Sequence, residues 1–392
     1  MQEISIPTTY KKYPYSSPTR NFHTHHLQEI SISTTYKRYP LQKETYLSGT
    51  TGDGTLRSFI LWFYLGKQYN MADFISLIEA RAQNQTPIGE VVILGFQTLH
   101  GYRVGLFVTF FAIYMLTLSG NLIVMLLMLL SRLLYSPMYF FLSNLSLSEI
   151  LLTTNITPLM LHVLLNNGVV MSISGCLVQL QLFGTFVATE SLLLTVMSYD
   201  RYLAICRPLH YASIMDYWSC VYLSISCWAL ATLISSISVG FTSTLYLCGS
   251  NIIDHFFCDF TPLLKLSCSD TSMVELEVSL LSTTPTIFPF LFIIITYCCI
   301  IKSIMRMPSL KGKEKAFSTC SSHLGVVSTY YMTIIVVYVV PTKGHSKTAD
   351  KVVSLLYTML TPLLNPIIYS LRNQEIKAAL GGLFKRKDTM KI

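Results

Sequence analysis

The chain has 392 residues, of which 52% are hydrophobic and only 12% are charged, and its formal net charge is +8. Soluble domains average about 25% charged residues. This shortage of charge, together with a positive mean hydropathy, excludes an ordinary soluble domain and predicts a protein that crosses a membrane several times. Because the sequence carries no nucleophile elbow, metal cluster or phosphate loop, we expect no enzyme activity and no nucleic-acid partner.

Residues 1–79 are expected to be a disordered N-terminal extension. They contain a repeated segment, QEISIPTTYKKYP at 2–14 and QEISISTTYKRYP at 28–40. Two copies are too few for a solenoid, and a polar segment without apolar periodicity cannot form a core. The apolar run 59–65 is too short to cross a membrane, and no cleavable signal peptide is recognised. Met71 is therefore a candidate alternative start.

Seven later segments are apolar over about 20 residues, which is the length that crosses a bilayer. They predict an all-α membrane protein, a seven-transmembrane helix bundle over residues 80–385 with a short tail at 386–392. The sixth and seventh segments carry interspersed polar residues, as helices facing a bundle interior do. The predicted spans are Val104–Leu130, Pro137–Leu165, Cys176–Tyr199, Ser219–Phe241, Val278–Met305, Phe317–Pro341 and Lys351–Leu371.

Loop charges predict the orientation of this bundle. Lys and Arg gather in the loops after the first, third and fifth spans and in the tail, whereas the long loop 242–277 is mainly acidic. The rule that cytoplasmic loops are positive then places the N-terminus outside and the C-terminus inside. Asn84, in the sequence Asn-Gln-Thr before the first span, is a candidate glycosylation site on the outer side. The similar patterns at Asn144 and Asn155 fall inside the second span and are expected to be unused.

Charged and polar residues inside the spans are candidates for function, because they are costly in a membrane. The third span ends in Asp200, Arg201 and Tyr202, and we interpret the acid–arginine pair as a conformational lock. In the seventh span, Pro366 after Asn365 frees a carbonyl that a neighbour must satisfy, which predicts a hinge. Tyr369 lies one turn below this hinge, and Tyr297 lies at a comparable depth in the fifth span. Alternatively, both tyrosines belong to the aromatic belt of the membrane surface.

Two glutamates form a deeper candidate site. Glu149 and Glu190 both lie about 17 Å from the inner ends of their helices, and Asn121 lies about 15 Å deep. Two carboxyl groups in one layer cannot both ionise without compensation, so either one is protonated or a cation lies between them. The alternative is that each glutamate is hydrogen-bonded separately to Ser and Asn side chains.

Four cysteines lie on the predicted outer side. Cys176 begins the third span, and Cys248, Cys258 and Cys268 lie in the loop that follows the fourth. In an oxidising compartment they predict two disulfides, and the sequence leaves three pairings open. The other six cysteines lie in helices or at the reducing face and are expected to be free.

Four motifs carry a resemblance to a known family. In chain order they are PMYFFLSNLSLSE at 137–149, MSYDRYLAIC at 197–206, KAFSTCSSHL at 315–324 and PLLNPIIYSLRN at 362–373. In this order and at this spacing they resemble the rhodopsin-like G-protein-coupled receptors and, among these, the odorant receptors. The FFCD at 256–259 resembles the class II, terrestrial-type group.

The resemblance implies a multi-pass plasma-membrane receptor that binds a small volatile odorant. It also implies a heterotrimeric partner, a stimulatory olfactory-type G protein that raises cyclic AMP. The basic residues Lys311, Lys313 and Lys315 suit contact with this G protein or with anionic membrane lipid.

Specific residue roles also follow from the resemblance. It implies disulfides Cys176–Cys258 and Cys248–Cys268, the first of which would hold the outer loop as a lid over the ligand. It implies a sodium ion near Glu149 and Glu190, the one candidate cofactor. On activation, Tyr297 and Tyr369 are expected to swing inward and meet Arg201.

The ligand pocket is expected in the outer half of the bundle. Helical spacing places four residues of the third span on one face above Glu190. Together with residues of similar depth on other spans they suggest an apolar cavity with a few hydroxyl groups and no charge, which favours a mainly apolar ligand. Met332, where the family usually has glycine, is expected to add bulk beside Tyr331. The predicted lining is Phe183, Gly184, Val187, Ala188, Leu281, Tyr331, Ile334, Ile335, Tyr338 and Thr358.

An ion-coupled transporter or channel is the alternative from another class of protein. It would use Glu149 and Glu190 as an ion relay. The sequence shows no inverted repeat and no paired broken helices, which such folds often contain. Helix packing is as good an explanation as ligand contact for any single pocket residue.

Overall fold

The computed structural model describes residues 88–130, 136–166, 168–248, 250–339, 347–372 and 376–378. The chain divides into two units, Met1–Gln68 and Tyr69–Ile392, and all described residues belong to the second. The repeated segment, the run 59–65, Met71, Asn84 and the tail at 386–392 therefore lie outside the described residues.

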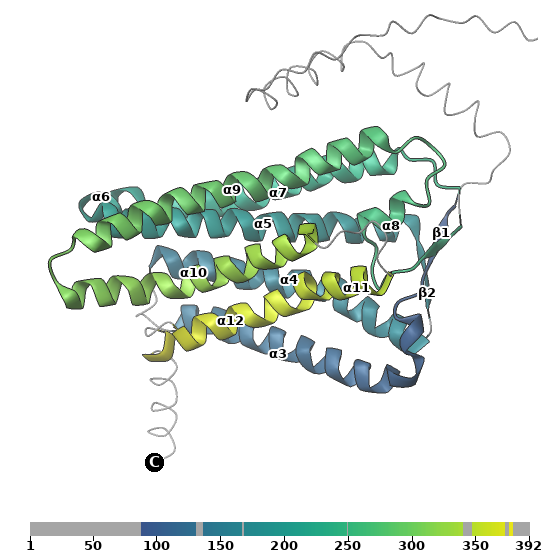
Figure 1. Ribbon diagram of the computed structural model, residues 1–392, viewed down its shortest axis with the longest axis horizontal. Helices are drawn as coiled ribbons and strands as arrows, with labels where there is room; N and C mark the ends of the chain where they lie inside the picture. The colour runs from purple at the N-terminus through teal and green to yellow at the C-terminus, as the bar shows by residue number, and fades with distance from the viewer. Residues whose placement is uncertain are drawn as a thin grey trace, which may run out of the picture. The chain divides into compact units, whose positions relative to one another are not determined.

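Seven long helical segments lie side by side in a bundle, as Figure 1 shows. Each corresponds to one predicted span, so the seven-helix fold is confirmed. The first six are continuous helices, whereas the seventh contains a π-helical turn, η3 (Leu356–Leu360), between α11 and α12. The long elements are α3 (Arg103–Leu130), α4 (Pro137–Asn166), α5 (Ile173–Cys206), α7 (Tyr217–Ser243), α9 (Ser272–Arg306), α10 (Leu310–Val339), α11 (Lys347–Leu355) and α12 (Thr361–Arg372).

Several helices are longer than the apolar runs that predicted them. α5 continues to Cys206, beyond the predicted end at Tyr199, and α10 begins at Leu310 rather than Phe317. The reason is that helix hydrogen bonds are local, so a helix can continue into water after its apolar run has ended. Hydropathy locates the membrane and not the ends of the helix.

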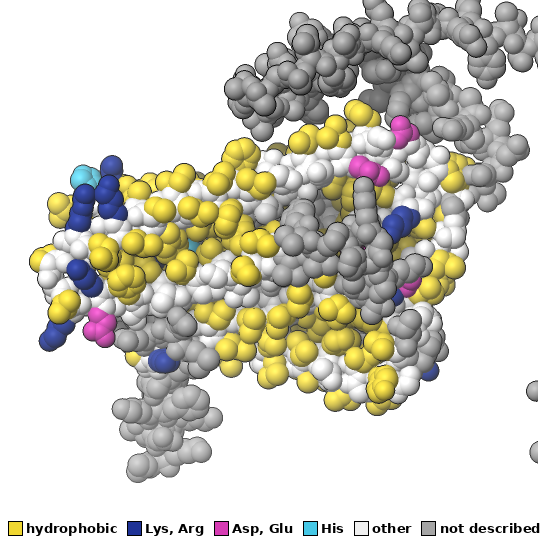
Figure 2. Space-filling model, in the orientation of Figure 1, with side chains coloured by type: hydrophobic (Ala, Val, Ile, Leu, Met, Phe, Trp, Pro, Cys, Tyr) yellow, Lys and Arg dark blue, Asp and Glu magenta, His cyan; other side chains and the backbone are white. Residues whose placement is uncertain are grey.

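Six of these helical segments are long and apolar enough to cross a membrane. The remaining one, α10, carries Lys311, Lys313 and Glu314 in its first turns and Ser, Thr and Tyr in its later turns. The outward-facing side chains of the bundle are apolar. Val104, Leu116 and Leu129 on α3 are 74%, 60% and 72% exposed, as expected of a surface that meets lipid. Figure 2 shows hydrophobic side chains covering the middle of the bundle, with Lys and Arg gathered at the α6 end.

A small three-stranded sheet covers the other end of the bundle, and the sequence did not predict it. β1 (Glu90–Ile93) pairs antiparallel with β2 (Val169–Ser172) and parallel with β3 (Ile252–Ile253). Val91 and Ile93 on β1 are fully buried. We call these strands, together with the loop 250–268, the lid. We call the opposite end of the bundle, which carries the short helix α6 (Pro208–Ile214), the lock end (Figure 1).

At two of the prolines inside helices, Pro289 and Pro366, a side chain of a neighbouring helix bonds to the carbonyl that the proline leaves open. A proline has no N–H to donate, so Pro289 leaves the carbonyl of Pro285 without its helical partner. The Ser191 hydroxyl on α5 donates to that oxygen at 2.6 Å. In the same way, Pro366 frees the carbonyl of Pro362, and Asn121 Nδ2 on α3 donates to it at 3.3 Å. The carbonyl predicted at the hinge is therefore satisfied by a specific side chain.

Gly95 provides a test of the lid. Its φ is +65°, and a Cβ there would lie 2.5 Å from Val163 Cγ1. Gly95→Ala should lower stability by about 1–2 kcal/mol because of the left-handed backbone, with the clash adding to this loss. We expect a lower thermal midpoint of the purified protein and less of it at the cell surface.

Gly89→Ala is the matched control, because no atom lies within 4 Å of a Cβ at Gly89. Equal midpoints for the two variants would contradict the described geometry of the lid.

Candidate functional site

The acid–arginine pair at the lock end is closed and buried. Arg201 Nε donates to Asp200 Oδ2 at 2.8 Å, and the guanidinium makes a second bond to the same carboxyl group. Asp200 has no exposed surface, and Arg201 is 8% exposed. Tyr211 on α6, which the sequence analysis did not single out, donates its hydroxyl to Asp200 Oδ1 at 2.8 Å. The pair thus joins α5 to the short helix that follows it, while Tyr202 is half-buried and stacks near Tyr199.

A second hydrogen-bonded group joins three helices just above this pair. His323 on α10 is fully buried, and its Nε2 lies 3.2 Å from the carbonyl oxygen of Leu194 on α5. A carbonyl can only accept, so Nε2 carries the proton and Nδ1 accepts from the hydroxyl of Tyr297 on α9, at 2.7 Å. Tyr297 is therefore held by His323 in this structure, and among the described residues its hydroxyl makes no hydrogen bond to Arg201. His323 stands inside the quoted motif at 315–324, but nothing in the one-dimensional pattern indicated that it was buried.

The two deep glutamates are buried inside the bundle, with Glu149 0% and Glu190 3% exposed. Asn365 Nδ2 donates to Glu149 Oε1, so a residue assigned to the hinge is the partner of this carboxyl group. The carboxyl groups of Glu149 and Glu190 are close enough to interact electrostatically. Glu149 Oε2, Glu190 Oε1 and Asn365 Oδ1 are buried and have no hydrogen-bond partner among the described residues. Three oxygen atoms without donors are suitable ligands for a hard cation.

Asn121 has a different role from the one predicted. Its amide donates to the carbonyl oxygens of Thr117, at 3.0 Å, and Pro362, at 3.3 Å. The first bond lies within α3, and the second joins α3 to α12 at the proline hinge; neither of them reaches Glu149 or Glu190. Tyr369, one turn below the hinge, is 1% exposed, and its hydroxyl has no partner within the described ranges.

Several predicted pocket residues lie between the helices beneath the lid. The Phe183 ring lies 5.5 Å from that of Phe257 in the lid and 5.8 Å from that of Tyr357 on η3. Ala188 and Tyr331 are buried, and Val187, Leu281 and Ile334 are half-buried. The Tyr331 hydroxyl lies 3.3 Å from that of Ser191. Thr358 is fully buried, with its hydroxyl donating to the Ser354 carbonyl at 2.7 Å.

Three expectations about the pocket need correction, those for Gly184, Ile335 and Met332, and a fourth concerns a side chain outside the described residues. At Gly184 a Cβ would lie 2.6 Å from Ser235 Oγ, so this glycine permits close packing of α5 on α7 and leaves no open space. Ile335 is 44% exposed on the outside of α10 and does not share the interior face. Met332 is 59% exposed, so it does not narrow the interior either. The side chain of Tyr338 is outside the described residues.

A groove of about 620 Å³ lies on the lipid-facing side of α7. Residues along one face of this helix line it, including Ile225, Trp228 and Thr232. None of the lining residues belongs to the predicted pocket, and we assign the groove no part in ligand recognition.

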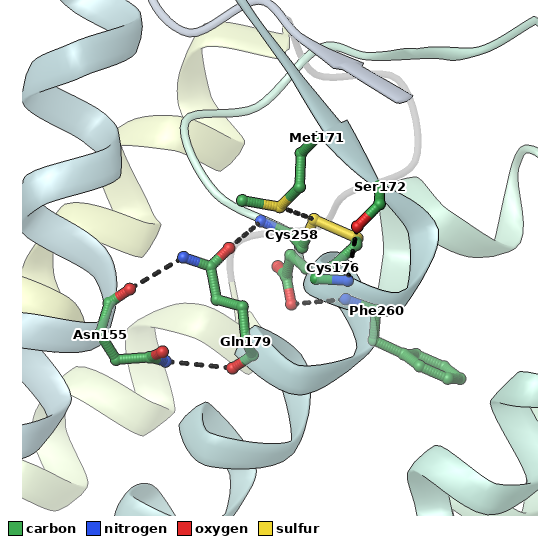
Figure 3. Close-up of a disulfide and its surroundings, with 9 residues drawn as sticks. Asn155, Met171, Ser172, Cys176, Gln179, Cys258 and Phe260 are labelled. Carbon is green, nitrogen blue, oxygen red and sulfur yellow. Dashed lines mark hydrogen bonds between the residues drawn. A yellow bond between two sulfur atoms is a disulfide. The ribbon is translucent and has the colours of Figure 1, made fainter. Parts of the chain in front are cut away.

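The lid is fastened to α4 and α5 around a disulfide, as Figure 3 shows. Cys176 is bonded to Cys258, the pairing that the resemblance implied. Beside it, Gln179 Oε1 accepts from the Cys258 amide at 2.9 Å, and Gln179 Nε2 donates to the Asn155 carbonyl at 2.9 Å. Asn155 Nδ2 in turn donates to the Gln179 carbonyl at 3.0 Å. The amide of Asn155 is thus engaged inside the bundle.

The second disulfide joins Cys248 to Cys268 within the loop, which is again the pairing that the resemblance implied. The two cysteines are 20 residues apart, and the ends of the loop between them are also joined by the Cys268 amide, which donates to the Tyr246 carbonyl at 2.9 Å. The six other cysteines are free, as predicted.

A seven-helix bundle with a buried acid–arginine pair at one end and a disulfide-held lid at the other has the architecture of a rhodopsin-like receptor. Squid rhodopsin superimposes on it with a TM-score of 0.61, at 18% sequence identity, over 78% of this chain and 83% of that chain. At this identity the likeness shows the fold alone.

The family follows from sequence comparison. The sequence model described as "Olfactory receptor" matches residues 110–387. Human olfactory receptor 10A7 is 43% identical over 310 residues, covering 79% of this chain and 98% of its own length. Rat olfactory receptor 1468 is 42% identical over 305 residues, covering 78% and 97%. The chain therefore belongs to the olfactory receptor family of G-protein-coupled receptors, which are multi-pass plasma-membrane proteins and not enzymes.

His255 in the lid predicts a dependence of stability on pH. It is 3% exposed, and its ring lies 4.6 Å from that of Phe256 and 4.8 Å from that of Phe257. Burial, and then the nearby ammonium of Lys351, lower the pKa of His255 to about 4. The unfolded state therefore binds a proton more readily than the folded state between pH of about 6.5 and 4. The corresponding stability is complete above pH 6.5 and falls by about 2 kcal/mol by pH 5.

We expect the thermal midpoint in lipid nanodiscs to drop between pH 7 and pH 5, and His255→Gln to reduce the drop. His162→Gln is the control, because that side chain is exposed. An equal drop in wild type and His255→Gln would contradict the burial of a neutral imidazole.

Proposed function

We propose that this chain is an odorant receptor that activates a stimulatory, olfactory-type G protein and so raises cyclic AMP. The observation that carries the proposal is the closed Asp200–Arg201 pair at the lock end of a chain that belongs to the olfactory receptor family. In this proposal the structure represents the resting state, and a ligand beneath the lid favours a second state in which the pair has opened.

The lid end is proposed to face outward and the lock end to face the cytoplasm. Both disulfides belong to the lid end, and disulfides persist in oxidising compartments. Exposed Arg207, Lys302, Arg306 and Lys311 lie at the lock end, which agrees with the rule that cytoplasmic loops are positive. Anionic lipid of the inner leaflet is a further proposed partner for these cations.

The proposed ligand is a small, mainly apolar volatile molecule. The predicted pocket residues that the structure leaves on interior faces are aliphatic, aromatic or hydroxylated, and none is charged. Such a lining gives no compensation for a buried ligand charge. Phe183 connects this region to the lid and to η3, and Tyr331 connects it to α5.

At the lock end the proposed G-protein contact includes Leu209. This side chain is 93% exposed on α6, between the basic Arg207 and His210. A fully exposed leucine on a short helix can insert into an apolar pocket of a partner, where its full burial would contribute about 1.5–3 kcal/mol. The opening of Tyr297 from His323 would release α10 from α9 near this contact.

The test is a cyclic AMP reporter assay with a chemically diverse panel of volatile compounds. Cells express the olfactory-type G protein with either the full chain or residues 71–392. We expect at least one agonist, the same response from the full chain and from residues 71–392, and no ligand-independent ionic current. Such a current without a rise in cyclic AMP would favour the alternative that the protein is a channel with Glu149 and Glu190 as its ion relay.

Two variants separate binding from coupling in this assay. Ala188→Phe should change the agonist response because it fills the interior face of α5, whereas unchanged responses to every agonist would refute the pocket. Leu209→Ala should weaken coupling by about tenfold. Ile214→Ala on the same helix is the control, because Ile214 is only 37% exposed.

We further propose that a sodium ion binds between Glu149 and Glu190, with Asn365 Oδ1 as a third oxygen ligand. When bound, the ion would compensate the charge of the two carboxyl groups. The support is the set of three buried oxygens without donors. Sodium should raise the free energy of unfolding by about 1 kcal/mol relative to choline at equal ionic strength, and this gain is measured as a higher thermal midpoint.

Glu190→Gln should abolish this sodium dependence. Thr157→Val, which removes another buried hydroxyl of α4 that has no partner in the described chain, should preserve it. A midpoint that does not respond to sodium in wild type would refute the ion and leave protonation of one glutamate as the explanation.

A further inference from the structure

Lys351 is a buried cation at the lid end of α11. Its side chain is only 8% exposed, and its Nζ makes two bonds of 2.6 Å, one to Asp254 Oδ1 and one to the carbonyl oxygen of Gly95. Lysines are almost never buried unless they are paired, because removing the charge from water is unfavourable. The position of this side chain is therefore determined by its two partners.

The two partners belong to different segments of the lid. Gly95 lies just after β1, and Asp254 lies just after β3. The backbone already joins these segments at this point: the Leu94 amide donates to the Ile253 carbonyl at 3.0 Å and the Gly95 amide to the His255 carbonyl at 2.9 Å. Lys351 thus holds both lid segments where they meet.

The lid consequently has two kinds of attachment to the bundle. The disulfide at Cys258, four residues after Asp254, fastens it covalently to α5. The Lys351 bonds fasten it to the start of the seventh helix without a covalent link. Between them these attachments define how far α11 stands from α5 at the lid end.

The segment after Lys351 leads directly to the candidate ligand region. α11 runs into η3, where Tyr357 lies against Phe183 of α5 and bonds to Ser354 at 3.1 Å. A π-helical turn contains one extra residue per turn, and such turns are frequent at functional sites. Farther along the same helix, Asn365 bonds to Glu149. A displacement of α11 therefore changes the wall formed by Tyr357 and Phe183.

We propose that Lys351 is a positioning residue for ligand recognition, and that its ion pair with Asp254 stays closed and holds α11 and Tyr357 at the geometry that the ligand requires. This inference rests on the proposed function. The pair acts on ligand sensitivity and leaves the lock end unchanged, so it alters the concentration for half-maximal response and not the maximal response.

The first test is a double-mutant cycle in the cyclic AMP assay, with variants compared at equal surface amount. Lys351→Met and Asp254→Asn should each raise the half-maximal agonist concentration by about tenfold, with equal basal and maximal responses. The double variant should also be raised by about tenfold and not by the product of about a hundredfold, because both single changes remove the same interaction. Lys265→Met, an exposed lysine of the same loop, is the control and should match wild type.

Lys351→Gln distinguishes loss of the ion pair from a general folding defect. It keeps a donor for the Gly95 carbonyl but removes the charge, so it isolates the ion pair, and it should show the same shift. Wild-type sensitivity in Lys351→Gln, or effects of the single variants that multiply in the double variant, would overturn the proposal.

Amide hydrogen exchange provides a readout that does not need signalling. In purified full-length Lys351→Met, exchange at 94–96, 251–258 and 347–357 should be about tenfold faster than in wild type, and exchange at α6 should be unchanged. If wild type responds to no odorant but this exchange still increases, the proposed function fails and the positioning contact stands. Unchanged exchange in Lys351→Met would refute the contact itself.

Discussion

Polar groups buried between these helices must be satisfied by the protein itself, since the core of a bilayer offers no water. The two prolines show how strongly this constraint shapes the bundle. Ser191 supplies a donor to the carbonyl that Pro289 leaves open, and Asn121 does the same opposite Pro366. Each proline weakens its own helix and also creates a polar link to a neighbour. The weak points of α9 and α12 are thus the points at which these helices are joined to α5 and α3.

The same constraint separates structural polar groups from those with another use. Several buried hydroxyls, such as those of Thr117, Thr153 and Thr189, donate to a carbonyl four residues earlier in their own helix. They are satisfied locally and need nothing from the rest of the molecule. The oxygens of Glu149, Glu190 and Asn365 that lack donors cannot be satisfied in this way and lie in one layer. That concentration supports a bound ion or a shared proton more strongly than the mere presence of two acids in the sequence did.

Much of this fold could be predicted from the sequence, because membrane spans and disulfides depend on local composition and on few residues. The Asp200–Arg201 pair was also accessible, since the two residues are neighbours in the chain. The partners of His323 and Lys351 were not accessible, because Leu194 and Gly95 are reached only after the helices have packed. Helical phase explains the pocket errors: Ile334 and Ile335 differ by one residue, about 100° around the helix, and only Ile334 faces inward. The sheet was missed because its strands are too short to show a periodic pattern.

The bonds that hold α10 suggest how a weak ligand could operate such a bundle. Three side chains of α10 bond to α5, namely Tyr330 to the Val187 carbonyl, Tyr331 to Ser191 and His323 to the Leu194 carbonyl. All three are bonds between neutral groups, and each contributes about 1 kcal/mol net. The helices joined by the lid, in contrast, are held by a disulfide and a buried ion pair. Because α10 is held more weakly, a ligand that disrupts the Tyr331 bond alone would shift the equilibrium between the two states about fivefold, and no rearrangement of the lid is required.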